Sequence, residues 1–323
     1  MNRKLVLSLI ALGVVTAFAS TTNADETTQA FDDMALVPAG EFIMGSDAVD
    51  TDKKGAEFGN VKPWYLDEHP RHNSTLPAYY IDRHEVSLAQ YRDFMITSGV
   101  NPPDNWAANG YVLSMKKDAL KQLPVEKLRA LSVKVFRLDL DTRTMEKDEI
   151  LAAIDQRFAD LDKLPVTFVS WQNADNYCRW AGKRLPTEKE WEKAARGTSG
   201  REFPWGDTWK AGLSATGAEQ WEFGVAPVGS YETDKSEFGI YDMVGNVSEW
   251  TSDWYQAYPG SDYKSEDFGE KFKVVRGAAI GASGHYALQM FQRSAYRGRF
   301  PADETYLDIG MRCAADAPAA PAK

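Results

Sequence analysis

Apolar residues recur three or four positions apart in several stretches of the chain, and this spacing predicts amphipathic helices there. Three of these helices are predicted to begin at a capping residue. Ser87 and Thr187 each precede Gln or Glu by three positions, as in a capping box, and Ser170 is an N-cap. The predicted helices cover residues 87–99, 125–135, 147–161, 170–182 and 187–197.

Shorter apolar runs predict strands. The runs at 36–38 and 41–44 flank Ala39 and Gly40, so we expect them to pair with each other as a hairpin. Further strands are expected at 74–82 and 273–280. The chain therefore carries both helices and strands.

A tight turn interrupts the apolar pattern at residues 238–250. Asp242 and Glu249 stand on either side of Gly245, and the turn between them directs main-chain carbonyls inward. Carbonyl and carboxylate oxygens are the ligands that calcium prefers, so the stretch predicts a cation site. The alternative is a solvated turn whose acidic side chains face water.

The chain begins with a basic segment and an apolar run at residues 5–18, followed by small residues at 22–24. This pattern predicts a secretory signal peptide over 1–24, because the run is too short to span a membrane. A retained anchor helix is the alternative. We expect a flexible arm at 25–33, a disordered tail at 316–323, and a secreted protein, periplasmic if the source is a Gram-negative bacterium.

The formal net charge of −10 bears on the possible partners. A negative surface repels phosphate backbones and anionic lipids, so we expect neither nucleic-acid binding nor membrane attachment once the signal peptide is removed. The sequence contains two cysteines, Cys178 and Cys313. In an oxidising compartment such a pair favours a disulfide, with two free buried thiols as the alternative.

Two other segments resemble metal sites. His69 and His72 suggest a histidine pair, but no third ligand is identifiable near them. Residues 139–149 resemble an EF-hand loop, yet Arg143 takes a ligand position and Glu149 comes one residue early. We therefore predict ordinary structural roles for both segments.

Several motifs in a fixed order closely resemble those of the formylglycine-generating enzyme family, also called sulfatase-modifying factors. The resemblance implies an α+β domain with the formylglycine-generating-enzyme fold, which has little regular secondary structure and is related to C-type lectins. The domain would span 34–315, with an inserted helical lobe at about 101–164 where the chain departs from the family pattern. The motifs are 36–45 (L-V-P-A-G-E-F-I-M-G), 80–86 (Y-I-D-R-H-E-V), 165–171 (P-V-T-F-V-S-W), 181–188 (A-G-K-R-L-P-T-E), 241–250 (Y-D-M-V-G-N-V-S-E-W) and 310–313 (G-M-R-C).

The resemblance implies two structural features. A family calcium site maps onto Asp242, Gly245, Val247 and Glu249, with Asp242 in place of the usual asparagine. Another family calcium site would fall near residues 213–222, where its aspartate is missing, so we expect that site to be lost or altered. The cysteines occupy the two positions that eukaryotic members join, which implies a Cys178–Cys313 disulfide.

The catalytic positions of the family are changed in this sequence. The enzyme binds copper through two cysteines, because soft thiolates select Cu(I). The first falls at Ala282 and the second within 287–289, a serine becomes Ala279 and a tryptophan becomes Ser248. We therefore expect no copper and no formylglycine generation. His285 and Tyr286 are the remaining catalytic candidates near the vacated cleft.

Arginines form a basic group near the vacated positions. Arg276, Arg293 and Arg297 have the fork-shaped donors that bind carboxylates or sulfates, so they are candidate ligand-binding residues together with Ser248, Ala279 and Ala282. The alternative is that the arginines form internal ion pairs, as they mostly do in the family.

Two functional classes remain open. The first is a calcium-stabilised accessory module that binds a peptide, protein or small-molecule ligand in the former active cleft. The second is a divergent periplasmic oxidoreductase, similar to oxidases that tailor siderophores of the pyoverdine type. We favour the first, because no replacement catalytic group can be named.

Overall fold

The computed structural model describes residues 31–57, 63–215, 221–222, 224–279 and 289–318 of the 323-residue chain. The described residues from Met34 onward form one compact unit. The predicted signal peptide, most of the arm and most of the tail lie outside the described residues. Within the described residues, no helix has both the length and the apolar character needed to cross a membrane.

In the N-terminal third the first strand pairs with the fourth and the second with the third. β1 (Met34–Val37) lies antiparallel to β4 (Tyr79–Asp82), and β2 (Gly40–Met44) lies antiparallel to β3 (His72–Leu76). The predicted hairpin between the first two runs is therefore wrong. Gly40 has a φ of 133°, and at this residue the chain passes from one sheet to the other.

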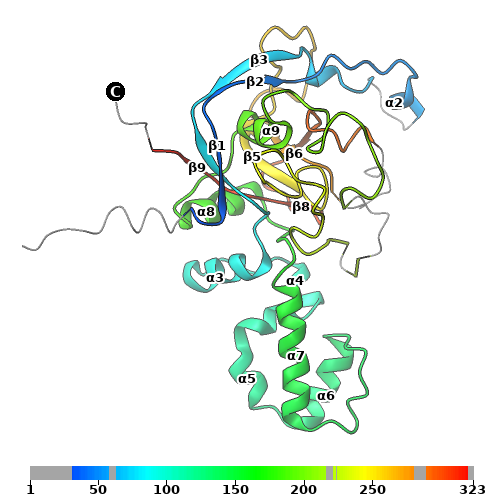
Figure 1. The fold of residues 1–323 in the computed structure, drawn as a ribbon. Coiled ribbons are helices and arrows are strands. Elements are labelled where there is room, and N and C mark those ends of the chain that lie inside the picture. The colour runs from blue at the N-terminus through cyan, green and yellow to red at the C-terminus, as the bar shows by residue number, and fades with distance from the viewer. Residues whose placement is uncertain (1–30, 58–62, 216–220, 223, 280–288, 319–323) are drawn as a thin grey trace, which may run out of the picture. The chain divides into compact units, whose positions relative to one another are not determined.

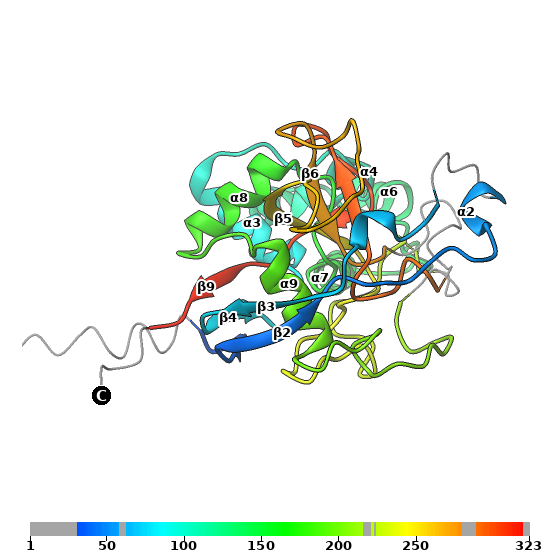
Figure 2. The ribbon, with the colours of Figure 1, turned by 90° about the horizontal axis from the view of Figure 1, so that it is seen from above.

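The C-terminal strand completes the first of these sheets. β9 (Ala314–Asp316) pairs with β4 on the side opposite β1, and the two strands run beside each other in Figure 2. Asp316 is paired with Tyr79, so β9 includes the first residue of the predicted tail. The first and last strands of the described domain are thereby held in one sheet.

A third sheet has four strands in the order β7-β6-β5-β8, and its last two strands are parallel. Helix α9 (Glu188–Arg196) contacts both this sheet and β2, and Figure 1 shows it between the two layers. Every residue of α9 except Lys189 is buried. The strands of the four-stranded sheet are β5 (Ser248–Trp254), β6 (Lys273–Arg276), β7 (Arg297–Phe300) and β8 (Ile309–Gly310).

Capping residues begin the helices as the sequence predicts. Ser170 caps α8 (Trp171–Trp180), and Thr187 forms a capping box with Glu190 at the start of α9. The predicted Cys178–Cys313 disulfide is present and joins α8 to the segment between β8 and β9. It closes a loop of 135 residues, which by chain entropy stabilises the fold by about 4–5 kcal/mol.

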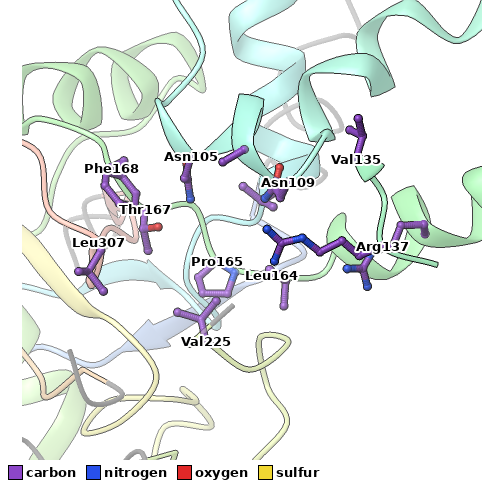
Figure 3. Close-up of a pocket in the computed structure, with 13 residues that line it drawn as sticks. Asn105, Asn109, Val135, Arg137, Leu164, Pro165, Thr167, Phe168, Val225 and Leu307 are labelled. Carbon is purple, nitrogen blue, oxygen red and sulfur yellow. The ribbon is translucent and has the colours of Figure 1, made fainter. Parts of the chain in front are cut away.

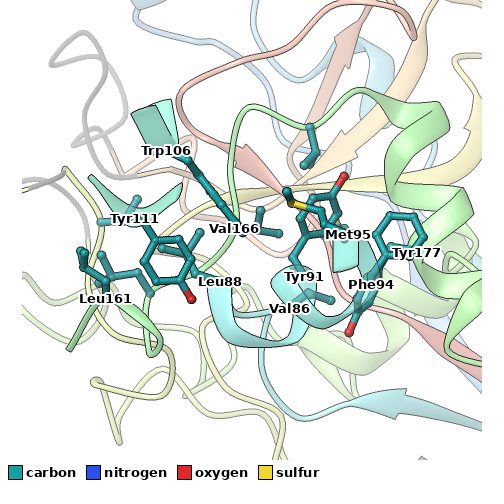
Figure 4. Packing of buried hydrophobic residues seen from close by; sticks show 14 of the residues in the cluster. Val86, Leu88, Tyr91, Phe94, Met95, Trp106, Tyr111, Leu161, Val166 and Tyr177 are labelled. Carbon is teal, nitrogen blue, oxygen red and sulfur yellow. The ribbon is translucent and has the colours of Figure 1, made fainter. Parts of the chain in front are cut away.

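Most of the remaining helices form a helical lobe and its base, and the lobe is drawn in cyan and green at the bottom of Figure 1. Its aromatic residues continue the main core, as Figure 4 shows for Tyr91, Trp106 and Tyr111. Trp106 meets the rings of Tyr91 and Tyr111 edge to face, at 6.2 and 4.6 Å between centroids. Short helices α2 (Lys54–Glu57) and η1 (Leu66–Glu68) lie outside this region. The helices of the lobe and its base are α3 (Leu88–Ser98), α4 (Asn105–Ala108), η2 (Tyr111–Lys116), α5 (Lys117–Lys121), α6 (Val125–Lys134) and α7 (Lys147–Leu161).

Candidate functional site

The predicted turn lies just before β5 and is fixed by several contacts. Asp242 and Asn246 adopt positive φ angles of 57° and 65°. A side chain at Gly245 would lie 2.7 Å from the carbonyl oxygen of Ala215, so this position requires glycine. The Asn246 side chain accepts a hydrogen bond from the main-chain N–H of Ala226 at 2.9 Å and donates to its carbonyl at 3.2 Å. The turn therefore has one defined conformation.

Glu249 leaves this turn on β5 and is completely buried. One carboxylate oxygen accepts hydrogen bonds from Trp191 Nε1 at 2.8 Å and Arg312 Nε at 2.7 Å, and the other accepts from Arg312 Nη2 at 2.7 Å. Arg312 also donates to the Tyr241 carbonyl at 2.8 Å. Both oxygens of this predicted calcium ligand are thus engaged by side chains of the protein.

Asp242 is buried beside two further acidic residues that the sequence analysis did not single out, Glu85 and Asp234. Burial raises the pKa of both neighbours well above the usual range, and the charge of Asp242 raises it further. Neither carboxyl oxygen of Glu85 has a hydrogen-bond partner among the described residues. Asp242 itself accepts a hydrogen bond from the main-chain N–H of Gly229 at 2.5 Å.

We refer to these residues together as the carboxyl cluster. It holds four buried carboxyl groups around one guanidinium group, and it lies at the turn onto which the family calcium site maps. Its members are Glu85, Asp234, Asp242, Glu249 and Arg312.

The side chains of the carboxyl cluster can be compared with the ligands that a calcium ion needs. Calcium takes carboxylate and main-chain oxygens and offsets buried negative charge. The unpartnered oxygens of Glu85 fit that requirement, and so does Asp242, whereas Glu249 is already bound to Arg312. No group of three or more His, Cys, Asp or Glu side chains in the described chain has a metal-binding arrangement, so main-chain carbonyls would have to complete the shell.

A second cluster of buried charge also contacts Trp191, and we call it the arginine centre. Arg276 donates to Glu188 and Glu192, both at 2.9 Å, and its guanidinium lies 5.3 Å from the Trp191 ring centre. Arg297 donates to Glu188 at 2.6 and 3.0 Å. Glu192 also pairs with the buried Arg196 at 2.8 Å, so two buried glutamates are bound by three guanidinium groups.

Burial raises the pKa of Glu188, but Arg297 and Arg276 more than offset this effect, so its pKa is lowered overall. The third candidate arginine, Arg293, is also buried and forms an ion pair with Glu68. The structure thus supports the internal ion-pair alternative for all three arginines. A ligand would have to break these pairs to reach them, because burial of an unpaired charge is strongly unfavourable.

The positions corresponding to the family's catalytic site contain no thiolate. Both cysteines of the chain are in the disulfide. Ser248 is buried and donates a hydrogen bond to the Gly277 carbonyl at 3.0 Å, and Ala279 is fully buried. Ala282, His285 and Tyr286 lie outside the described residues.

The other two metal-like segments have structural roles. His69 Nε2 is 2.6 Å from the Ala48 carbonyl oxygen, and His72 Nδ1 is 2.8 Å from that of Pro70. In the EF-hand-like segment, Arg143 is exposed and forms an ion pair with Asp141 at 2.7 Å. Both observations agree with the sequence prediction for these segments.

The second family calcium site, which we expect to be lost or altered, would fall near residue 213. Here the Leu213 carbonyl accepts a hydrogen bond from Thr233 Oγ1 at 2.5 Å. Glu222 forms an ion pair with Arg157 of helix α7. Both contacts are within the protein. Gln220, which was part of the same sequence prediction, lies outside the described residues.

Glu85 and Asp234 were not predictable from the sequence, for different reasons. Glu85 belongs to the motif at 80–86, but nothing in the motif distinguishes a buried acid from an exposed one. The N–H of Tyr241 donates to the Arg83 carbonyl at 2.8 Å, and this main-chain bond brings the motif to the turn. Asp234 sits in a polar loop that gives no local signal.

Comparison with known proteins gives a consistent result. The family model described as the sulfatase-modifying factor enzyme 1-like domain matches residues 19–317. The formylglycine-generating enzyme of Mus musculus is 30% identical over 305 residues, which cover 88% of this chain and 75% of the relative. The inactive C-alpha-formylglycine-generating enzyme 2 of Bos taurus is 28% identical, covering 88% of both chains.

A solved structure gives the same assignment of fold. PvdO from Pseudomonas aeruginosa superposes with a TM-score of 0.55 at 22% identity, covering 88% of this chain and 94% of PvdO. Agreement over nearly the full length of both chains supports the predicted α+β fold. At this level of identity the likeness is one of fold alone.

Proposed function

Because the chain belongs to the sulfatase-modifying factor enzyme 1-like family, we propose that it is a copper-free member that binds a ligand without generating formylglycine. The observation that carries this proposal is the Cys178–Cys313 disulfide, which uses the only two cysteines in the sequence. Copper(I) in such an oxidase depends on soft thiolate ligands, and a disulfide supplies none. A relative described as inactive supports the idea that the fold can exist without the activity.

Calcium is the proposed stabilising ion, at the turn before β5. Asp242, Glu85 and the carbonyls of Gly245 and Val247 would hold it, while Glu249 is oriented by Arg312 at the edge of the site. This set differs from the sequence prediction by exchanging Glu249 for Glu85. When bound, calcium would supply positive charge to a buried region that holds four carboxyl groups and one guanidinium group.

Secretion or periplasmic location completes the proposal. A disulfide that closes a long loop is typical of proteins from oxidising compartments. The expected signal peptide at residues 1–24 supports the same location. In that setting the protein would act as an accessory or binding module for a peptide or small molecule.

Metal analysis of the purified protein tests the proposal directly. After incubation with copper and calcium and removal of excess metal, we expect bound calcium and no stoichiometric copper or iron. A cysteine-containing peptide incubated with the copper-treated protein and oxygen is expected to yield no aldehyde, with an active formylglycine-generating enzyme as the positive control. Stoichiometric copper or iron, or aldehyde formation, would overturn the proposal in favour of a divergent oxidoreductase.

A further inference from the structure

A cavity of about 200 Å³ lies where the helical lobe meets the rest of the domain. Figure 3 shows its lining residues, which come from segments far apart in the sequence. Asn105 belongs to α4, Arg137 follows α6, and Leu164 and Phe168 belong to the segment between α7 and α8. The cavity exists only because the lobe is present, and its wall includes Leu307 from the loop after β7.

The described side chains that line the cavity include two arginines and carry no negative charge. No acidic residue is among the described residues that line it. Arg137 forms no hydrogen bond or ion pair with any other described residue. The second arginine of the lining, Arg157, is paired with Glu222. One guanidinium group therefore remains available to an anion that enters the cavity, and its planar fork suits a carboxylate.

A buried acceptor in the same wall also lacks a partner. Asn105 Oδ1 is shielded from solvent and accepts no hydrogen bond from the described residues. Such an atom destabilises the folded state unless a donor reaches it, by about 1–3 kcal/mol. Asn105 lines the cavity, so rotation of its amide group would bring this oxygen to a ligand that carries an N–H or O–H group.

Two side chains of the wall are held in a backbone conformation that bulky residues rarely adopt. Arg137 has a φ of 50° and Phe168 a φ of 58°. The N–H of Phe168 donates to the Tyr306 carbonyl at 2.9 Å, which helps to keep this residue in place. Strained residues of this kind persist where surrounding contacts fix them, and they are concentrated at functional sites.

The remaining wall is mainly apolar, with Leu164, Pro165, Val225 and Leu307 among its members. It therefore offers a hydrocarbon surface next to one cationic fork and one acceptor. We propose that this cavity binds a small organic carboxylate that carries an apolar group and an N–H donor, such as an acylated amino acid or a peptide C-terminus. The inference rests on the proposed function of a ligand-binding module and names a site and ligand class for it.

Two probes that differ in one group provide the test. N-acetyl-L-leucine has the carboxylate, the N–H donor and the apolar side chain, whereas N-acetyl-L-leucinamide lacks only the carboxylate. Titration of the full chain, followed by NMR, is expected to show that the acid binds more tightly than the amide, by up to about fivefold because Arg137 is exposed to solvent. Arg137→Gln should remove this difference by weakening the acid alone.

Further variants separate the parts of the site. Asn105→Leu should weaken the acid and the amide alike, because both donate through N–H. Leu307→Trp, at a position whose side chain is 49% exposed, should fill the cavity and block both probes. Arg143→Gln removes an exposed arginine of the same lobe and serves as the matched control. Melting curves verify that each variant is folded.

Several outcomes would overturn this inference. These are no binding by the wild type, equal binding of acid and amide, or the same affinities for Arg137→Gln and Arg143→Gln. The metal and aldehyde measurements do not depend on the cavity, so the copper-free assignment stands or fails separately from the ligand site.

Discussion

The arginine centre and the carboxyl cluster both contact Trp191 and differ in their charge balance. The ring of Trp191 faces Arg276 in the first, and its Nε1–H donates to Glu249 in the second. In the arginine centre every carboxylate is paired, with three guanidinium groups for two glutamates, whereas the carboxyl cluster has four carboxyl groups for one guanidinium group. A cluster whose carboxylates are all paired is complete as a structural element, while the unbalanced carboxyl cluster requires bound protons or a cation.

Breaking the arginine centre is expected to have the largest effect on stability. Arg276→Met keeps an unbranched apolar side chain in place but leaves each glutamate with one guanidinium partner, Glu188 with Arg297 and Glu192 with Arg196. We expect the free energy of unfolding to fall by about 3–5 kcal/mol, because two buried hydrogen bonds to carboxylates and one to the Ser294 carbonyl are lost. Urea denaturation measures this change.

Arg143→Gln is the control for Arg276→Met, because its ion pair is exposed to solvent. We expect this variant to unfold like the wild type, since exposed pairs contribute little. The destabilisation of Arg276→Met should be the same with and without a chelator. A loss of stability below about 1 kcal/mol would contradict the structural role of the arginine centre.

Binding of calcium by the unbalanced cluster is expected to have the next largest effect. With free calcium near one hundred times its dissociation constant, removal of the ion would lower the free energy of unfolding by about 2.7 kcal/mol. Asp242→Ala and Glu85→Gln should each abolish this dependence, because each removes a proposed ligand. Thermal unfolding of the wild type and of both variants, with calcium and with chelator, measures the stabilisation by calcium and its loss.

Glu41→Gln on β2 makes the same chemical change at an exposed position and is expected to leave the chelator effect intact. In chelator, Glu85→Gln should be at least as stable as the wild type, because it removes a buried acid that no donor satisfies. Identical melting curves of the wild type with and without chelator would rule out the calcium proposal.

Local signals made some of these features predictable. Capping residues and periodic apolar positions identify α8 and α9, because both depend on neighbours in sequence. The Cys178–Cys313 bridge followed from the family resemblance and from the number of cysteines. The arginines were also recognised as a group, with internal pairing as one of two stated alternatives.

The sequence predictions are wrong or incomplete where contacts between distant segments determine the structure. The runs at 36–38 and 41–44 form no hairpin, because β4 and β3 compete successfully as partners. The carboxylate of Glu249 is taken by Arg312, which lies 63 positions away, and Glu85 reaches the turn through a bond from Tyr241. The cavity beside the helical lobe is also assembled from such segments, so no local pattern predicts it.

The smallest expected effect is a difference in pH dependence between the two clusters. In chelator, the raised pKa values of Glu85 and Asp234 mean that the folded state binds more protons than the unfolded state. Their contribution is therefore complete below the ordinary carboxyl pKa and is lost as the pH rises through the raised values. Glu188 has a lowered pKa, so its contribution is lost only as the pH falls through that value.

Between about pH 5 and 7 the two clusters can thus be separated, because Glu188 stays ionised in both states there. We expect the chelated wild type to lose stability as the pH rises across this range, at up to about 1.4 kcal/mol per pH unit for each group that titrates. Glu85→Gln should reduce that slope, and Glu41→Gln should not. Melting curves at half-unit pH intervals measure the slopes. An equal slope in the wild type and in Glu85→Gln would mean that Glu85 is charged without calcium, and the contrast between the clusters would then fail.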